Sequence, residues 1–76
     1  MAKLTELSYA DVTSRLKTFG FRFYRHGKGS HELWVRESDG KVVPIPNHKS
    51  KPIRKGMLRA ILREIEVSVN DFFTMK

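Results

Sequence analysis

The chain has 76 residues, with 15 Lys and Arg against 8 Asp and Glu, a formal net charge of +7 and no cysteine. A domain of this size buries only about 60% of the surface that its unfolded chain exposes, which excludes a deep, walled active site. The lack of cysteine excludes disulfides and thiolate metal sites, and the charge favours a polyanionic partner, nucleic acid before an anionic membrane surface.

The first predicted helix begins after Ser8, whose hydroxyl can cap it, with Asp11 three residues on as the partner of a capping box. Gly20 can adopt the left-handed conformation that ends a helix, so the helix is expected to end near residue 19. Apolar residues recur between these signals on one helical face, at Val12, Leu16 and Phe19.

Three β-strands are predicted next, over residues 21–25, 31–37 and 41–46, because apolar and polar residues alternate there. A Ser-Asp-Gly turn separates the second strand from the third. Pro44 and Pro46 cannot donate hydrogen bonds to a ladder, so the third strand is expected at an edge or to end early.

The alternation also assigns the two faces of the predicted sheet. We expect the face toward the helices to carry Phe21, Phe23, Leu33 and Val35. The opposite face is expected to carry Tyr24, His26, Glu32 and Trp34. On that face Tyr24 and Trp34 can stack nucleic-acid bases, pair across the strands, or form an apolar patch that a partner protein covers.

A polar, basic loop follows Pro46 and leads into a second helix, predicted from the spacing of Met57, Leu58, Ile61, Leu62 and Ile65. Ser68 and Asp71 can cap a short third helix. Strands grouped apart from helices predict an α+β fold: α-β-β-β-α with a short C-terminal helix, in which the helices lie on one face of an antiparallel three-stranded sheet.

We interpret residues 1–76 as a single domain, because no linker, repeat or low-complexity tract interrupts them. No apolar run approaches the roughly 20 residues of a membrane span. The N-terminus also lacks the apolar core of a signal peptide. These patterns predict a soluble, cytoplasmic protein.

His31 stands directly after a Lys-Gly-Ser turn, at the first residue of the second predicted strand. It is expected on the same strand face as Leu33 and Val35, which places it at the rim of the core on the helix side. A histidine there can be structural, with one backbone hydrogen bond, or can transfer protons. Its position alone leaves both interpretations open.

Cations are concentrated in two stretches that flank this strand. Residues 12–31 hold five Lys or Arg and no acid, and residues 49–63 hold six and no acid. Arg54 and Lys55 fall at the start of the second helix, where the helix dipole disfavours cations but a phosphate binds well. Lys28 lies between two glycines, so that turn can present backbone N–H groups to an anion.

The blocks "GFRFYRHGKGSHELW", "VPIPNH" and "KGMLRAILREIEVSVNDF" resemble successive blocks of the HicA-type (YcfA-like) toxins of bacterial and archaeal toxin–antitoxin pairs, from about Leu7 to Phe73. The resemblance implies a fold like that of double-stranded-RNA-binding domains. It also implies an endoribonuclease that cleaves mRNA, inhibits translation and growth, and is held in check by a HicB-type antitoxin. The chain departs from the family at Met57, where threonine is usual, and at Glu66, where glycine commonly closes the second helix.

The family's catalytic histidine, in Gly-Ser-His, maps onto His31. Cleavage through the 2′-hydroxyl needs a base, an acid for the leaving oxygen and cations for the developing charge, and histidine can supply either proton transfer without a metal. We expect no cofactor, and no metal site, because the three histidines lack helical spacing and Glu32 points to the other face from His31. The residues expected to bind RNA are Lys28, Gly29, Ser30, His48, Lys49, Lys51, Arg54 and Lys55.

Two points stay open. His48 can be a second proton carrier or a phosphate contact. The whole domain can also be a non-catalytic RNA-binding module, in which His31 only positions the Lys28 turn. In the toxin interpretation, the antitoxin is expected to be acidic and to cover His31 together with residues 49–55, since an acidic protein imitates the RNA backbone.

Overall fold

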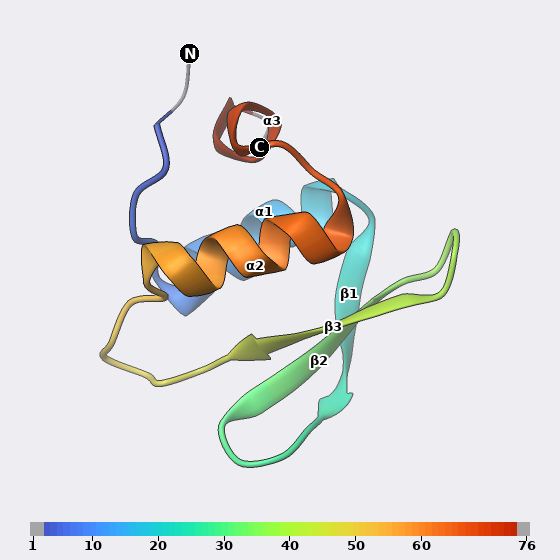
Figure 1. Ribbon diagram of the computed structural model, residues 1–76. Coiled ribbons are helices and arrows are strands. Elements are labelled where there is room, and N and C mark those ends of the chain that lie inside the picture. Colours follow the sequence, from blue (N-terminus) through green and yellow to red (C-terminus); the bar gives the residue numbers. More distant parts are fainter. Residues whose placement is uncertain (1–2, 75–76) are drawn as a thin grey trace.

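The computed structural model describes residues 3–74, which form six elements in the order α-β-β-β-α-α (Figure 1). They are α1 (Tyr9–Thr18), β1 (Phe21–His26), β2 (His31–Arg36), β3 (Lys41–Pro46), α2 (Lys55–Ile65) and α3 (Val69–Thr74). The predicted α+β class, the element order and the short C-terminal helix are confirmed.

The ends of α1 follow from local chemistry, as the sequence predicts. Ser8 lies in extended backbone and its hydroxyl accepts a hydrogen bond from the Asp11 backbone amide at 3.0 Å. The other half of the predicted capping box, a bond from the Ser8 N–H to the Asp11 carboxylate, does not form in residues 3–74. At the other end Gly20 has a φ of +89°, the left-handed conformation that glycine adopts without steric cost. Between these caps Val12 and Leu16 are fully buried in the core.

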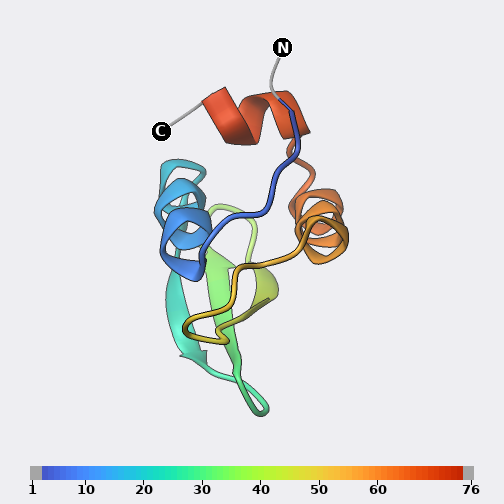
Figure 2. The same cartoon turned by 90° about the vertical axis from the view of Figure 1, so that its left-hand side faces the viewer.

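The sheet is antiparallel with the strand order β1-β2-β3, so β2 is central and β3 is an edge, as its prolines predict. Helix α1 packs over β1 and α2 over β3, and both lie on the same face of the sheet (Figure 2). Helix α3 packs against them through Phe72, whose ring stacks on Phe19 at 6.0 Å between centroids. The other sheet face carries no helix of the described chain.

The predicted faces of β2 are wrong. Trp34 pairs across the ladder with Phe23 and Val43, faces the helices, and is only 4% exposed. Leu33 and Val35 therefore point to the face without helices. Apolar side chains lie on both faces of this strand. The Trp34 indole has more apolar surface to bury than the side chain of Leu33 or Val35, so it lies on the core side.

A β-bulge at Tyr24 changes the faces of β1. Phe23 pairs with Trp34, but the next paired residue is Arg25, opposite Leu33, which leaves Tyr24 as an extra residue. The insertion returns His26 to the face of Phe23, and the two rings lie edge to face at 5.5 Å. The prediction that His26 faces away from Phe23 is therefore wrong, as is the predicted shared face of Tyr24 and Trp34.

Glu66 ends α2 in the left-handed conformation, with a φ of 60°. Its backbone N–H donates to the carbonyl of Arg63 at 3.3 Å, and that of Val67 donates to Leu62 at 3.1 Å. This is the conformation in which a glycine is usual at such a helix end. The glutamate thus makes the glycine-type turn in spite of its Cβ.

Candidate functional site

Three chain segments meet at one end of the sheet: the turn 27–30, the start of β2 and the loop 47–54. They meet because β1 ends, β2 begins and β3 ends at the same end of the antiparallel sheet. The backbone N–H of Asn47 donates to the carbonyl of Ser30 at 2.9 Å and joins the loop to the turn. The basic stretches on either side of His31 in the sequence are thereby brought together in space.

His31 is the first residue of β2 and is exposed, paired across the ladder with Pro46. It shares the face of Leu33, so its predicted place on the helix side is wrong for the same reason as that of Leu33. Its Nδ1 lies 3.3 Å from the carbonyl oxygen of Lys28. Because a carbonyl can only accept, this contact assigns the proton to Nδ1 and leaves Nε2 free for proton exchange.

The turn before His31 is held by its backbone. The N–H of His31 donates to the carbonyl of Lys28 at 3.0 Å, and that of Gly27 donates to the carbonyl of His31 at 2.9 Å. Gly29 has a φ of +58°, which places a left-handed residue at the tip of the turn. Lys28 is exposed at this tip, beside the imidazole.

His31 lines two hollows. One, the His31–Arg54 hollow, has a volume of about 550 Å³ and is lined by Glu6, His31, Pro46, His48, Lys51, Pro52, Ile53, Arg54 and Met57. The other, of about 510 Å³, is lined by Arg25, His26, Gly27, Lys28, His31, Leu33 and Pro44. Of the predicted site residues, the structure groups His48, Lys51 and Arg54 on one side of His31 and Lys28 on the other, while Gly29, Ser30, Lys49 and Lys55 line neither hollow.

The first turn of α2 borders the His31–Arg54 hollow. Arg54 is the N-cap residue, and no side chain caps the helix by a hydrogen bond; the first turn holds no acidic residue. The backbone N–H groups at this end and the positive end of the helix dipole are therefore not offset by a capping side chain or by a carboxylate of the first turn. An anion, a phosphate above all, is the group that this arrangement attracts.

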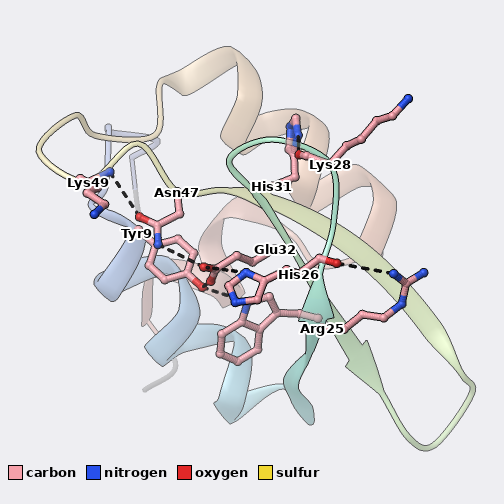
Figure 3. Close-up of polar contacts among 9 residues, drawn as sticks. Tyr9, Arg25, His26, Lys28, His31, Glu32, Asn47 and Lys49 are labelled. Atoms are coloured by element: carbon pink, nitrogen blue, oxygen red, sulfur yellow. Dashed lines mark hydrogen bonds and ion pairs between the residues drawn. The ribbon is translucent and has the colours of Figure 1, made fainter.

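A polar network lies behind His31, on the helix face of the sheet. Glu32, whose side chain is 17% exposed, accepts a hydrogen bond from the Tyr9 hydroxyl and one at 3.4 Å from the Asn47 amide group. Trp34 Nε1 donates to the Tyr9 hydroxyl at 3.3 Å. Burial and the hydrogen bond to Glu32 raise the pKa of Tyr9 to about 12. Figure 3 shows these side chains gathered around Glu32, while His31 lies apart from them with Lys28.

Asn47 extends this network into the basic loop. Its side-chain oxygen accepts a hydrogen bond from the backbone N–H of Lys49 at 3.3 Å (Figure 3). Lys49 has a φ of 54°, so the chain turns sharply here, and the N–H of Lys51 then donates to the carbonyl of His48 at 3.1 Å. Asn47 thus shapes the segment that carries His48 and Lys51 toward His31. Asn47 was not among the predicted site residues, although asparagine is a common turn residue.

Met57, Pro52 and Glu6 were also missed as site residues. The spacing of Met57 predicts only a helix residue, but its side chain is 44% exposed and lines the His31–Arg54 hollow. Within residues 3–74, no group of three or more His, Cys, Asp or Glu side chains is placed to hold a metal ion. No helix in the same range is long and apolar enough to cross a membrane.

A protein-family model matches the greater part of the chain. The model of a family described as the HicA toxin of bacterial toxin–antitoxin systems matches residues 9–67. That range contains the turn, all of the sheet, the basic loop and α2. No curated protein matches the chain significantly.

Proposed function

The chain belongs to the HicA family of toxins from bacterial toxin–antitoxin systems, and we propose that it is an endoribonuclease that cleaves mRNA with His31 as its proton-transfer residue. The observation that carries this proposal is the setting of His31. Its ring is exposed, its Nδ1 is engaged by the Lys28 carbonyl, and the cationic side chains of Lys51 and Arg54 share its hollow. Nε2 is left to exchange a proton with a bound substrate.

In the proposed reaction, Nε2 of His31 accepts the proton of a ribose 2′-hydroxyl. The 2′-oxygen attacks the adjacent phosphorus, and the bond from phosphorus to the 5′-oxygen of the next nucleotide breaks. The products are a 2′,3′-cyclic phosphate and a 5′-hydroxyl, whose proton comes from a second acid. His48 lines the same hollow as His31 and is the candidate for that acid, while Lys51 and Arg54 stabilise the extra negative charge on the phosphoryl oxygens.

The proposed partner in the cell is a HicB-type antitoxin with an acidic surface. The charge of +7 and the exposure of His31, Lys49, Lys51 and Arg54 support it. Such a surface attracts an acidic protein as it attracts the RNA backbone. The antitoxin would then inhibit by occupying the substrate's place over His31 and residues 49–55.

One observation favours a second candidate, a non-catalytic RNA-binding domain. The contact of His31 Nδ1 with the Lys28 carbonyl also ties the side chain to its own turn. In this case the imidazole holds the turn and its proton never moves. The two functions share the RNA partner and differ in whether the RNA is cut.

Replacing His31 separates the two functions. We expect His31→Ala and His31→Gln to abolish cleavage of RNA and growth inhibition, and to keep the fold and most of the RNA affinity, because the exposed ring buries little area. His26→Ala is the matched control and should keep cleaving, since His26 does not line the His31–Arg54 hollow in which the reaction is proposed. Cleavage by the unmodified protein should survive EDTA, stop on a substrate with a 2′-deoxy scissile nucleotide, and leave a 2′,3′-cyclic phosphate.

Nuclease-free His31→Ala protein that cuts RNA at the original rate would show that this histidine has no part in the chemistry. Protein that binds RNA but does not cut it, in vitro or during translation in cells, would make the RNA-binding domain the correct function. Circular dichroism of each variant would establish that the fold is kept.

A further inference from the structure

The His31–Arg54 hollow has a lining that a phosphate alone does not need. Beside its cations it presents apolar surface from Pro46, Pro52 and Met57. Met57 is 44% exposed, an unusual position for a large apolar side chain among cations. The volume of the hollow, about 550 Å³, lies within the roughly 300–1,000 Å³ of small-molecule sites. A ligand that matches this lining has an apolar part as well as a negative charge.

Glu6 forms one wall of the same hollow, and the backbone holds it there. The segment before α1 pairs with the loop before α2: Ile53 N–H donates to the Leu7 carbonyl at 2.7 Å, and Leu7 N–H donates to the Ile53 carbonyl at 3.3 Å. Leu7 and Ile53 turn toward the core. Because side chains alternate along extended backbone, Glu6, Pro52 and Arg54 turn the other way, toward the hollow.

The carboxylate of Glu6 has no partner there. Within the described part of the chain it makes no hydrogen bond and no ion pair, although Lys51 and Arg54 line the same hollow. A carboxylate beside bound RNA repels phosphate, so it weakens a site that binds only the backbone. The same group accepts hydrogen bonds with two oxygens and donates none, which suits a ligand edge that carries N–H groups.

We propose that the His31–Arg54 hollow is a nucleobase subsite next to the scissile phosphate, in which Met57 and the prolines contact the base and Glu6 selects bases that carry an exocyclic amino group. This inference rests on the proposed function, because it takes RNA as the substrate. It adds a determinant of sequence preference, which the cations cannot supply since every nucleotide has the same phosphate.

Base chemistry orders the expected preference. Guanine presents two adjacent N–H donors on its pairing edge, matching both oxygens of a carboxylate. Adenine and cytosine each present one amino group next to a ring nitrogen that accepts. Uracil has a single N–H between two carbonyl oxygens, which a carboxylate repels. We therefore expect guanine to bind best and uracil worst.

Binding of RNA that cannot be cut tests the subsite apart from the chemistry. The probes are four 2′-O-methyl pentanucleotides, UUXUU with X as G, A, C or U, because their 2′-oxygens cannot attack. Dissociation constants from fluorescence anisotropy should favour G over U by roughly tenfold, the value of one good bidentate contact to a base. The Met57 methyl signal in NMR spectra should shift on binding.

Glu6→Gln keeps the shape and removes the charge, so it should bring the four dissociation constants close together. Glu37→Gln is the matched control: it makes the same change in charge, but Glu37 pairs with Arg22 at the other end of β2, and the preference for G should remain. Met57→Ala should weaken binding of all four probes and keep their order.

Equal binding of the U and G probes, an unchanged preference in Glu6→Gln, or a Met57 methyl signal that does not move would each overturn the subsite. Failure of the two proposals can be told apart. A preference that depends on Glu6, in a protein that never cuts RNA, overturns cleavage and keeps the subsite. Cleavage that depends on His31 but shows no base preference overturns the subsite alone. A protein that binds none of the four probes also overturns the subsite.

Discussion

Tyr9, the first residue of α1, donates the hydrogen of its hydroxyl to the carboxylate of Glu32 on the central strand. Glu32 directly follows His31, so this bond ties α1 to the start of the strand that presents the imidazole on the opposite face. Trp34 and Asn47 complete the network on either side. The start of β2 is therefore held from the helix layer and not only by the ladder.

Tyr9→Phe should lower the free energy of unfolding by about 1–3 kcal/mol, because it leaves the half-buried Glu32 carboxylate without its tyrosine donor. Urea denaturation measures the change. Tyr24→Phe is the control and should have little effect, since Tyr24 is exposed at the bulge and its hydroxyl makes no hydrogen bond within residues 3–74. Equal stability of both variants would show that the Tyr9–Glu32 bond adds nothing net.

The same residue predicts an alkaline effect. Burial, and then the hydrogen bond to Glu32, raise the pKa of Tyr9 from 10.0 to about 12. The folded state holds this proton more tightly than the unfolded chain, so the associated stability is complete below pH 10 and is lost as the pH rises toward 12. Between these values the free energy of unfolding should fall more steeply in the original protein than in Tyr9→Phe. Parallel curves would contradict the assignment.

Asn47→Ala should lower the rate of RNA cleavage by roughly tenfold to a hundredfold and change RNA affinity less, because it frees the loop that holds His48 and Lys51 against His31. Single-turnover cleavage and anisotropy measure the two effects separately. Ser50 is exposed in the same loop, and Ser50→Ala should leave the cleavage rate and the RNA affinity unchanged. A loss of affinity without a loss of rate would show that Asn47 serves binding rather than the placement of reacting groups.

Replacing Lys51, Arg54 and Lys55 together by alanine should weaken binding to all RNA sequences alike. The logarithmic salt dependence of binding should shrink by about 0.7 for each single-strand phosphate that the variant no longer neutralises, up to about 2 for three phosphates. Arg22→Ala with Lys41→Ala is a control, because these cations already pair with Glu37 and Glu64. An unchanged salt slope in the triple variant would place the RNA backbone elsewhere.

A complex with the proposed acidic antitoxin should protect His31 and the loop 49–55 from solvent, and its dissociation constant should rise with salt. Histidine hydrogen–deuterium exchange followed by mass spectrometry measures the protection of each ring. His26, which lines only the second hollow and not the His31–Arg54 hollow, is the histidine with which His31 is compared. A complex that stops cleavage while His31 exchanges as in the free protein would show that inhibition does not act by covering the imidazole.

Glu66→Gly should raise the free energy of unfolding by about 0.5–1 kcal/mol. Glycine removes the cost of roughly 1–2 kcal/mol that a side chain incurs in the left-handed region, and part of the gain is offset by the greater freedom of the unfolded chain. Glu64→Gly, in the interior of α2, should instead destabilise by about 1 kcal/mol. A less stable Glu66→Gly variant would mean that the glutamate side chain stabilises the turn by more than its strain costs.

Local signals in the sequence determined the order of the elements and the ends of α1. Ser8 caps α1, Ser68 accepts from the Asp71 amide at the start of α3, and Gly20 ends α1 as a left-handed residue. Each of these interactions joins residues within four positions of one another. Short range is the reason that spacing and residue type were sufficient to predict them.

Cross-strand pairing decided the faces of the sheet, and no local pattern contains it. The alternation in β2 fits either orientation, and burial of Trp34 between Phe23 and Val43 selects one. The bulge at Tyr24 likewise exists only in the pairing of β1 with β2, and it turns His26 to the helix side. Alternation along a strand does not predict its two faces where both faces carry apolar residues, or where a bulge inserts one residue.

The sequence by itself singled out His31 and the cations around it as candidate site residues, because a Gly-Ser-His block and runs of Lys and Arg are visible in the chain order. Only the tertiary structure decided what surrounds that histidine. The pairing of Leu7 with Ile53 brings Glu6 into the hollow, and the bonds of Asn47 to Glu32 and Ser30 bring the basic loop there. These contacts join residues that are far apart along the chain, and they form only when the core closes around α1, the sheet and α2.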